Sequence, residues 1–330
     1  MAENRGNGVR RLRVAAVQTR PVTGETAANL ARAGALVERA AADGARLIVL
    51  PELGVGGYRL EPALWDTAEP REGLTVGWLR ETAGRLGVYL GVSYLEAADD
   101  DFFNTFVLAG PDGREAGRVR KSSPAMSEAF FFRGEASAHV VDTPLGRIGI
   151  GICNDNHLAF LPRLLQRQGA DLVLMPHAWG TPFRTSKLVG PEDVARQERM
   201  SREIAPLYVH YLGIPAVFAN RCGAVDPASP PGLIARLLPP VTDYHFPGLS
   251  TIADSDGQIA ARLDGDESYV VGEVTLDPAR KVTALPPAYG RHAYPGPPGR
   301  WLLRVDELIG RLGYARNAER RRKARAISCR

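Results

Sequence analysis

Short apolar runs alternate with amphipathic stretches along the first half of this chain. Residues 25–43 are rich in alanine and leucine and end at Gly44, which is typical of a helix, whereas residues 46–52 form the apolar run of a buried strand. The same reasoning predicts further helices over residues 70–87, 157–168 and 191–212. Further strands are predicted over residues 11–18, 88–96, 104–109, 114–121, 147–152, 171–176, 215–221, 246–253, 258–263 and 268–276. Residues 11–276 therefore read as one strand-rich α/β domain.

A strong turn signal, Pro111 to Gly113, joins strands 104–109 and 114–121. A turn this short connects antiparallel strands, whereas parallel strands need a longer crossover. Part of the sheet is therefore expected to be antiparallel or mixed.

The composition changes after the last predicted strand. Residues 301–312 have the spacing of an amphipathic helix before a basic tail, and a proline-rich arm precedes them. The clustered prolines are Pro286, Pro287, Pro295, Pro297 and Pro298. We divide the chain into a flexible N-terminus (1–10), a main domain (11–285), and an arm with helix and basic tail (286–330). The arm cannot form its own core, so we expect it to reach a neighbouring subunit and bury its aromatic residues Tyr289, Tyr294 and Trp301.

Composition limits the class of protein to which the chain belongs. Its 330 residues are 45% hydrophobic and 24% charged, which is typical of a globular protein with a substantial core. Three cysteines without metal-ligand spacing favour a cytoplasmic location, and no apolar run suggests a secretory signal or a membrane span. Much of the net charge of +4 lies in the tail, which we interpret as a solvated helix end and not as a nucleic-acid contact.

Three reactive side chains stand at the C-terminal ends of predicted strands. Glu52, Lys121 and Cys153 each end or directly follow such a strand, and this end of an α/β sheet commonly carries the active site. The strand before Cys153 alternates isoleucine with glycine, so its glycine face suggests close approach of a backbone or a ligand. Taken alone, Cys153 is equally consistent with a nucleophile and with a buried structural cysteine.

The sequences around these residues resemble the signature motifs of the nitrilase superfamily, the carbon-nitrogen hydrolases. The similar stretches are Leu-Ile-Val-Leu-Pro-Glu at 47–52, the strand entering Lys121, Gly-Arg-Ile-Gly-Ile-Gly-Ile-Cys at 146–153, Val-Ala-Ala-Val-Gln at 14–18, Ala-Asn-Arg at 219–221 and Phe-Pro-Gly-Leu-Ser at 246–250. Together they extend over nearly the whole of residues 11–276. The resemblance implies a four-layer αββα sandwich with mixed sheets, in which Glu52, Lys121 and Cys153 are catalytic.

The chemistry of these three side chains agrees with the resemblance. A thiolate attacks an amide or nitrile carbon once a base has removed the thiol proton, and Glu52 can be that base. Lys121 and the backbone N–H of Asn154 would bind the oxygen that becomes negative, and water activated by Glu52 would hydrolyse the resulting thioester. By resemblance, Glu128 is a second assisting glutamate, although Arg133 stands where the family commonly has proline. No cofactor or metal is expected.

Two other classes of function stay open at this point. His177 follows a predicted strand, so the chain could be a thiol enzyme with a Cys-His pair. The same fold could also serve a non-catalytic binding protein, although a lysine and two acids near a buried thiol are costly to keep without use. Release of ammonia from amides distinguishes an enzyme from a binding protein.

By resemblance, the substrate is a small amide, carbamoyl or nitrile compound, and acyl transfer to an amine is a further alternative. Cys153-Asn154-Asp155 is similar to the Cys-Asn-Asp of N-carbamoyl-D-amino-acid amidohydrolases, so we rank amide or carbamoyl cleavage above nitrile cleavage. The resemblance also implies a homodimer or larger assembly. The residues expected to contact the substrate are Tyr58, Phe130, Asn154, His177 and Trp179.

The preferred charge of the substrate depends on arginines near the site. Amidohydrolases of the Cys-Asn-Asp type follow this triplet with arginines that hold a substrate carboxylate, but Asn156 and His157 stand there in this chain. Unless Arg133, Arg184 or Arg221 reaches in from another loop, the substrate carboxylate has no arginine partner. We therefore expect a neutral amide to be preferred over an N-carbamoyl amino acid.

Overall fold

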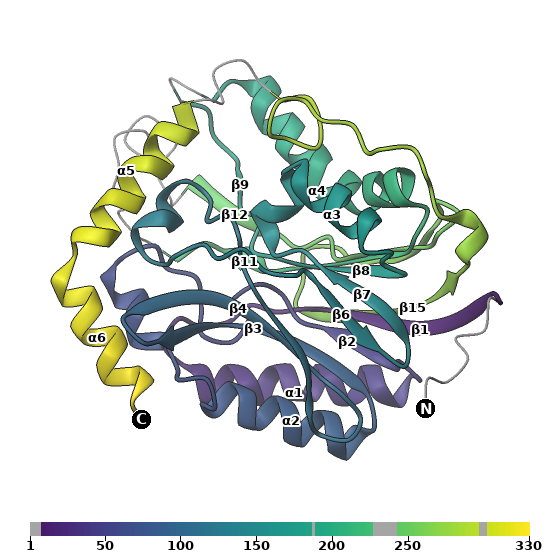
Figure 1. Ribbon diagram of the computed structural model, residues 1–330, viewed down its shortest axis with the longest axis horizontal. Helices are drawn as coiled ribbons and strands as arrows, with labels where there is room; N and C mark the ends of the chain where they lie inside the picture. Colours follow the sequence, from purple (N-terminus) through teal and green to yellow (C-terminus); the bar gives the residue numbers. More distant parts are fainter. Residues whose placement is uncertain (1–7, 187–188, 227–242, 297–301) are drawn as a thin grey trace.

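The fold is a sandwich of two β-sheets between two layers of helices. A computed structural model of the chain describes residues 8–186, 189–226, 243–296 and 302–330. Two six-stranded sheets face each other, and a pair of helices covers the outer face of each (Figure 1). The helices are α1 (Thr26–Ala42) and α2 (Leu74–Leu86) on the first sheet and α3 (Phe160–Arg167) and α4 (Pro191–Leu212) on the second. The prediction of a four-layer αββα sandwich is confirmed.

The first sheet has mixed strand directions. Its strand order is β15 (Ser268–Leu276), β1 (Arg10–Gln18), β2 (Leu47–Val49), β3 (Tyr89–Ala98), β4 (Asp101–Ala109) and β5 (Glu115–Arg120). β1, β2 and β3 run parallel, whereas β15 and β4 run antiparallel to their neighbours. The predicted hairpin corresponds to β4 and β5, so the expectation of an antiparallel part is confirmed.

The second sheet is also mixed, and a small third sheet is built from segments next to its strands. The second sheet has the order β14 (Ile259–Arg262), β13 (Thr251–Ala253), β10 (Ala216–Asn220), β8 (Leu172–His177), β7 (Gly146–Ile150) and β6 (Val140–Thr143). The third sheet contains β11 (Cys222–Ala224), β12 (Tyr244–Pro247) and β9 (Thr181–Pro182). The strand predicted over 246–253 is therefore two strands, because the positive φ angles of Gly248 (70°) and Leu249 (61°) turn the chain between them.

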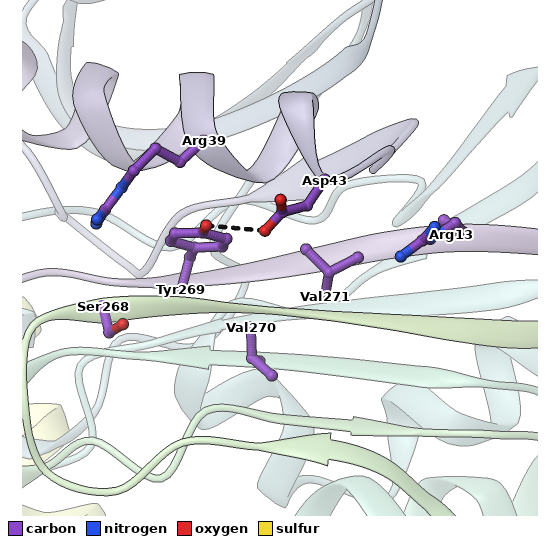
Figure 2. Close-up of a pocket in the computed structure, with 7 residues that line it drawn as sticks. All are labelled: Arg13, Arg39, Asp43, Ser268, Tyr269, Val270 and Val271. Atoms are coloured by element: carbon purple, nitrogen blue, oxygen red, sulfur yellow. Dashed lines mark hydrogen bonds between the residues drawn. The ribbon is translucent and has the colours of Figure 1, made fainter.

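Polar contacts as well as apolar packing hold α1 against the first sheet. The guanidinium of Arg39 lies 5.1 Å from the centre of the Tyr269 ring, and the Tyr269 hydroxyl donates a hydrogen bond of 2.9 Å to Asp43 (Figure 2). Leu30 and Val37 of α1 are buried in the apolar layer beneath.

Among the helices of the described residues, none has the length and the apolar character that a membrane span requires.

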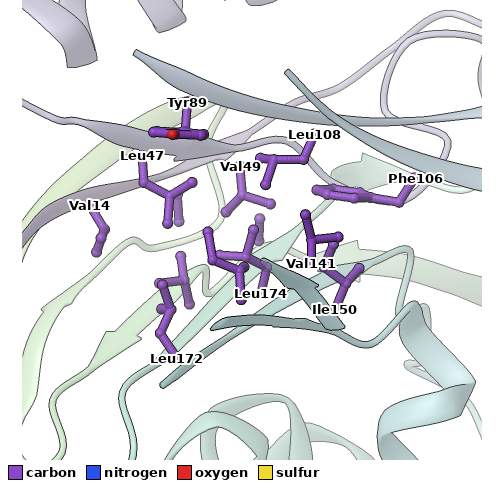
Figure 3. Packing of buried hydrophobic residues seen from close by; sticks show 14 of the residues in the cluster. Val14, Leu47, Val49, Tyr89, Phe106, Leu108, Val141, Ile150, Leu172 and Leu174 are labelled. Carbon is purple, nitrogen blue, oxygen red and sulfur yellow. The ribbon is translucent and has the colours of Figure 1, made fainter. Parts of the chain in front are cut away.

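Apolar side chains from the facing sides of the two sheets form the central core. Ile150 of β7 points into it among residues of both sheets (Figure 3). On the opposite face of β7, a Cβ atom on Gly149 would lie 2.9 Å from the side chain of Leu165 in α3. A Cβ atom on Gly151 would lie 2.1 Å from Asn156 Oδ1. The glycines therefore admit side chains of the same domain, and a Cβ atom on Gly149 would also lie 3.3 Å from the backbone oxygen of Leu172.

The proline-rich arm lies against its own chain in the part that the structure describes. The N–H of the buried Ala293 donates to the His157 carbonyl at 2.9 Å, and its carbonyl accepts from the Tyr211 hydroxyl at 2.7 Å. Tyr294 forms a hydrogen bond with His157 Nδ1. These arm residues pack on α4 and on the segment after Cys153, where we had expected a neighbouring subunit. Residues 297–301 of the predicted arm and helix, which include Pro297, Pro298 and Trp301, lie outside the described part.

Two C-terminal helices run along one flank of the sandwich, coloured yellow in Figure 1. They are α5 (Leu302–Arg316) and α6 (Ala318–Ser328). α5 covers the short 3-10 helix η2 (Met126–Phe130), where a Cβ atom on Gly310 would lie 2.9 Å from the ring of Phe130. The glycine thus permits close contact between α5 and η2.

α6 contains the basic tail and packs on the domain. Arg320 is only 3% exposed, its guanidinium carbon lies 3.9 Å from the centre of the Tyr314 ring, and it forms an ion pair of 2.5 Å with Asp101. Ala324 and Ile327 are buried on the same face of the helix. The interpretation of the whole tail as a solvated helix end is wrong, because the face of α6 that carries Arg320, Ala324 and Ile327 packs against the end of the first sheet.

We expect Arg320→Ala to lower the free energy of unfolding by about 2 kcal/mol, because it removes the closest cation of Asp101 and the stacking on Tyr314. Urea unfolding followed by circular dichroism measures the loss. Arg322→Ala removes the same charge from an exposed position of the same helix and should change stability by less than about 0.5 kcal/mol. Equal losses in the two variants would show that α6 does not depend on this ion pair.

Candidate active site

Glu52, Lys121 and Cys153 come from different strands and meet at one end of the sandwich. Glu52 follows β2, Lys121 follows β5, and Cys153 follows β7. Lys121 Nζ lies 2.6 Å from Glu52 Oε1, and the charges of both groups act on the Cys153 thiol. The structure therefore brings together the three side chains that the strand ends had suggested.

A buried lysine lies between two buried carboxylates. Lys121 Nζ donates hydrogen bonds of 2.6 Å to Glu52 Oε1 and to Glu128 Oε2. Burial alone would lower the pKa of Lys121, but the negative charges of Glu128 and Glu52 outweigh burial and hold this pKa above its ordinary value. Burial raises the pKa of Glu128, and the charge of Lys121 opposes the rise. Lys121 is therefore a fixed ammonium group between two acids.

Two further hydrogen bonds fix the Glu52 carboxylate. Asn104 Nδ2 donates to its Oε1 at 2.7 Å, and the backbone N–H of Ala178 donates to its Oε2 at 2.9 Å. The Ser93 hydroxyl donates to Asn104 Oδ1 at 2.8 Å, which sets the orientation of the amide. Sequence reasoning missed Asn104. The available signal was a polar residue at the start of the strand predicted over residues 104–109.

Cys153 lies at a sharp bend of the backbone. Its φ is 44°, in the left-handed region that residues other than glycine rarely adopt, and it opens the 3-10 helix η3 (Cys153–His157). Strain of this kind is typical of functional sites. Burial raises the pKa of the thiol, the charge of Glu52 adds to the rise, and Lys121 opposes it. The thiol is therefore protonated at neutral pH and needs a base before it can attack.

A tyrosine and a backbone N–H hold Glu128 in place. The Tyr58 hydroxyl donates to Glu128 Oε1 at 2.6 Å, and the N–H of Ala125 donates to Oε2 at 2.6 Å. Burial and the charge of Glu128 raise the pKa of Tyr58, so the phenol stays a donor. The structure thus brings Tyr58 to the site, whereas Phe130 lies against the glycines of α5. We call Glu52, Lys121, Glu128 and Cys153 the acid–lysine–thiol cluster.

Asp155 organises the loop that follows Lys121. Its two carboxylate oxygens accept hydrogen bonds from the backbone N–H groups of Ser122 at 3.0 Å and Ser123 at 2.8 Å. Asn154 Nδ2 donates to the carbonyl of Ser123 at 3.0 Å, so the segment after the thiol is joined to the segment after the lysine. The sequence indicated Asp155 only as part of a motif, and the structure gives it a positioning role.

Asp155→Asn should lower the free energy of unfolding by about 2 kcal/mol, because an amide offers one oxygen to two N–H donors. We also expect kcat to fall at least about tenfold, since the loop next to Lys121 loses an anchor. Urea unfolding and steady-state kinetics measure the two effects. Asp266→Asn, at an exposed position, should change neither quantity. A fully stable and active Asp155→Asn variant would refute the positioning role.

Most of the chain matches a known protein family. The family model described as carbon-nitrogen hydrolase matches residues 13–284. The chain belongs to this family. The resemblance to the nitrilase superfamily is thereby confirmed, and the protein is a C–N hydrolase.

Individual relatives of this carbon-nitrogen hydrolase differ in the activity that they are named for. An N-carbamoylputrescine amidase from Arabidopsis thaliana is 29% identical over 262 residues, which are 76% of this chain and 82% of that protein. A nitrilase from Pyrococcus abyssi is 34% identical over 176 residues, which are 52% of this chain and 67% of that protein. The crystal structure of a carbon-nitrogen hydrolase from Helicobacter pylori has a TM-score of 0.69 at 21% identity and covers 82% of this chain and 90% of its own. That likeness shows the same fold.

His177 and Trp179 of this hydrolase lie together beside the ring of His157. The ring centres of His157 and Trp179 are 4.0 Å apart, and those of His157 and His177 are 5.8 Å apart. His177 Nδ1 is hydrogen-bonded to the Met175 carbonyl at 3.0 Å, and its buried Nε2 has no partner among the described residues. Burial lowers the pKa of His177 to about 3, so the imidazole is neutral. Ala178, between the two predicted residues, supplies the N–H that binds Glu52.

The structure distinguishes the three arginines that the sequence left as candidates. Arg133 has a side chain that is 58% exposed and pairs with Asp101 at 2.8 Å. Arg184 has a side chain that is 70% exposed and pairs with Asp243 at 3.6 Å. Arg221 is 3% exposed and lies among aromatic rings next to the site. Of the three candidates, Arg221 is the one that lies inside the hydrolase.

The surface pocket in Figure 2 is not the site of this chemistry. It is lined by residues of β1, α1 and β15 and by Asp43 just after α1, none of which belongs to the acid–lysine–thiol cluster. Within the described residues, no group of three or more His, Cys, Asp or Glu side chains is placed to hold a metal ion. The strand ends that carry the cluster therefore remain the candidate active site.

Proposed function

We propose that this hydrolase cleaves the C–N bond of an amide or an N-carbamoyl compound through a thioester on Cys153. The observation that carries the proposal is the ammonium group of Lys121, fixed between the buried carboxylates of Glu52 and Glu128 and close enough to act on the thiol. A base, a cation and a sulfur nucleophile are the groups that transfer of an acyl group from nitrogen to water requires.

In the first step, Glu52 accepts the proton of Cys153 while the sulfur attacks the carbonyl carbon. The C–S bond forms, and the electrons of the C=O π bond move to the oxygen. Lys121 and the backbone N–H of Asn154 stabilise this oxyanion, and one such fixed donor is worth about 3 kcal/mol. Because Lys121 stays charged and immobile between two acids, its donor is in place before the reaction begins.

In the second step, the oxyanion reforms the carbonyl and the C–N bond breaks. The proton held by Glu52 passes to the nitrogen, so ammonia or an amine leaves and the thioester remains. Water then attacks the thioester while Glu52 takes one of its protons. The C–S bond breaks to release the acid, and the proton on Glu52 passes to the sulfur, which restores the thiol and the carboxylate. Glu128 and Tyr58 keep Lys121 in position throughout.

A Cys-His pair is a weaker explanation of the same residues. Burial lowers the pKa of His177 to about 3, whereas burial raises the pKa of the Cys153 thiol. A base with such a low pKa takes a proton poorly from such a weakly acidic thiol. A non-catalytic binding protein is disfavoured as well, because the buried lysine and acids cost free energy of folding without serving a reaction.

Among the bond types, we rank amides and N-carbamoyl compounds above nitriles. The Cys153-Asn154-Asp155 triplet supports this ranking, as does a relative named N-carbamoylputrescine amidase. Nitrile cleavage is the alternative supported by a relative named nitrilase. Amide-forming acyl transfer on the same thioester is a further alternative.

Ammonia release from a panel of amides, N-carbamoyl compounds and nitriles tests the proposal. Acid quenching during turnover, followed by mass spectrometry, should find the acyl group of the substrate on the peptide that contains Cys153. Cys153→Ala is the control that should carry no acyl group. Turnover without acylation of Cys153 would overturn the thioester mechanism, and an added amine acceptor that captures the acyl group would identify a transferase.

We further propose a homodimer or larger assembly in the cytoplasm, with residues 11–285 as the hydrolase domain and 286–330 as an appended segment. An exposed apolar stripe on α5 supports an interface, and three free cysteines support a reducing compartment. The stripe consists of Val305, Leu308, Ile309 and Leu312. Light scattering at micromolar concentration should give at least twice the mass of one 35.7 kDa chain. A monomer would refute the assembly.

A further inference from the structure

Arg221 is a buried arginine that the described chain leaves partly unpaired. It lies between β10 and β11 and is 3% exposed. Its Nε and Nη1 atoms have no hydrogen-bond partner among the described residues. Asp226 is the acid that most opposes the effect of burial on Arg221, and its carboxylate is itself hydrogen-bonded by the Thr23 hydroxyl. A buried guanidinium with unsatisfied N–H groups destabilises the fold, so the arrangement indicates a missing partner.

Aromatic rings hold the guanidinium of Arg221 in place. Its central carbon lies 4.7 Å from the ring centre of Phe246 on β12 and 5.9 Å from that of Tyr58. The backbone is fixed too, because the Arg221 carbonyl accepts a hydrogen bond of 3.0 Å from the N–H of Gly248. Contacts with aromatic faces leave the N–H groups at the edge of a guanidinium free to bind an acceptor. The cation is thus positioned before any ligand arrives.

Tyr58 connects this arginine to the acid–lysine–thiol cluster. The same side chain that lies against Arg221 donates its hydroxyl hydrogen bond to Glu128 and is acted on by the charge of Cys153. The charge of Glu52 acts on Arg221 in turn. Burial lowers the pKa of Arg221 to about 10, so the group remains a cation at neutral pH. Tyr58 therefore places a fixed positive charge one side chain away from the acid–lysine–thiol cluster.

We propose that Arg221 binds a carboxylate of the substrate, so that this hydrolase acts on amides or N-carbamoyl compounds that carry a negative charge. The inference rests on the proposed function and adds the substrate's charge to it. A carboxylate supplies the acceptors that the guanidinium lacks, and its negative charge offsets the burial of the cation. The expectation of a neutral substrate held unless an arginine such as Arg221 reached the site, and this inference takes that alternative.

Matched substrates test this inference with the unaltered enzyme. The probes are the monoamides of malonic, succinic, glutaric and adipic acid, each compared with the diamide of the same chain length. N-carbamoyl amino acids are compared with their own primary amides, and N-carbamoylputrescine provides a cation. We expect kcat/KM to be at least about tenfold higher for the acid of the best matched pair, and lowest for the cation. The chain length of the preferred monoamide then indicates the distance from the thiol to Arg221.

The two proposals fail in different ways in this experiment. Release of ammonia from neutral or cationic probes without preference for the acids would overturn the role of Arg221 and leave the proposed function standing. Release from none of the probes would overturn the proposed function and this inference together. A preference confined to the N-carbamoyl amino acids, or to the monoamides, would support the inference and assign the carboxylate to the amine or the acyl side of the bond.

Variants at Arg221 separate binding from support of the fold. Arg221→Gln should lower kcat/KM for the best acid about 10- to 100-fold, mainly through KM, and change the value for its neutral diamide less than about threefold. Arg221→Lys should restore part of the loss. Arg184→Gln is the matched control, because this exposed arginine lies 6.0 Å from the Phe183 ring and its loss changes the net charge equally. Equal losses for the acid and the diamide would assign Arg221 to structure alone.

A measurement on the unaltered enzyme covers the case in which Arg221 variants do not fold. Free dicarboxylates of the best chain length should inhibit hydrolysis of a neutral amide competitively, and their diesters should inhibit at least about tenfold more weakly. Equal inhibition by the acid and the diester would contradict the inference.

Discussion

Cys153→Ala should lose at least about 10⁴-fold in kcat while its urea unfolding curve stays close to that of the unaltered enzyme. The thiol is the atom that bonds to the substrate carbon in the proposed reaction, and no other group in the cluster can replace it. The residue is only partly buried and the substitution removes a single sulfur atom, so the loss of packing is small. Cys153→Ser should also lose turnover, because a hydroxyl is a far weaker acid than a thiol and the same base must deprotonate it. Ammonia release and urea unfolding measure both effects.

Cys329→Ser is the control for this prediction. Cys329 is exposed at the end of the described chain, so this substitution should leave both kcat and stability unchanged. Turnover in Cys153→Ala above about one hundredth of the original rate would exclude a thioester as the main route.

Glu52→Gln should have opposite effects on turnover and on the reactivity of the thiol. We expect kcat to fall at least about 10³-fold, because glutamine cannot accept the proton of Cys153. Burial and the charge of Glu52 raise the pKa of the thiol, so removing that charge beside Lys121 lowers this pKa. In the unaltered enzyme, alkylation of Cys153 by iodoacetamide should be slow at pH 7 and should rise with pH toward the raised pKa of the thiol. In Glu52→Gln the rise should begin at lower pH.

The rate of iodoacetamide labelling between pH 6 and pH 10, with peptide mass spectrometry to identify Cys153, measures this shift. Glu135→Gln removes a charge from an acid that pairs with Arg120 outside the cluster, and it should alter neither labelling nor turnover. A Glu52→Gln variant whose thiol reacts more slowly at every pH would show that the glutamate activates the thiol in the resting enzyme, not only during attack.

Local pattern placed the candidate residues at strand ends, and the resemblance to the nitrilase superfamily singled them out. Glu52 and Cys153 each follow an apolar run and Lys121 follows the second strand of the predicted hairpin, and these strand ends lie at one end of the sandwich. Asn104 and Asp155 were not assigned roles, because their partners are far away in sequence. A hydrogen bond to a side chain or a backbone N–H of a distant segment leaves no periodic signal in the chain.

Tertiary contacts also explain why the sequence pattern gave wrong predictions for some elements. The tail is so rich in arginine that its charge indicates solvation, yet one face of α6 pairs with acids at the β3–β4 turn and buries Ala324 and Ile327. The helix predicted from residue 157 begins only at Phe160, because η3 uses the preceding residues to turn the chain at the thiol. Arg221 was one of three candidates in the sequence, and only its burial between two rings distinguishes it.

The contact between α5 and η2 also bears on how the enzyme is made. Glu128 lies on η2, yet the helix that covers η2 begins at residue 302. During synthesis the segments that carry the thiol, the lysine and both glutamates leave the ribosome well before this cover exists. A nascent chain that has emerged only as far as the proline-rich arm therefore contains every reactive side chain of the cluster without the helix that supports one of its acids. Full activity is expected to appear only when the C-terminal helices have been translated and have docked.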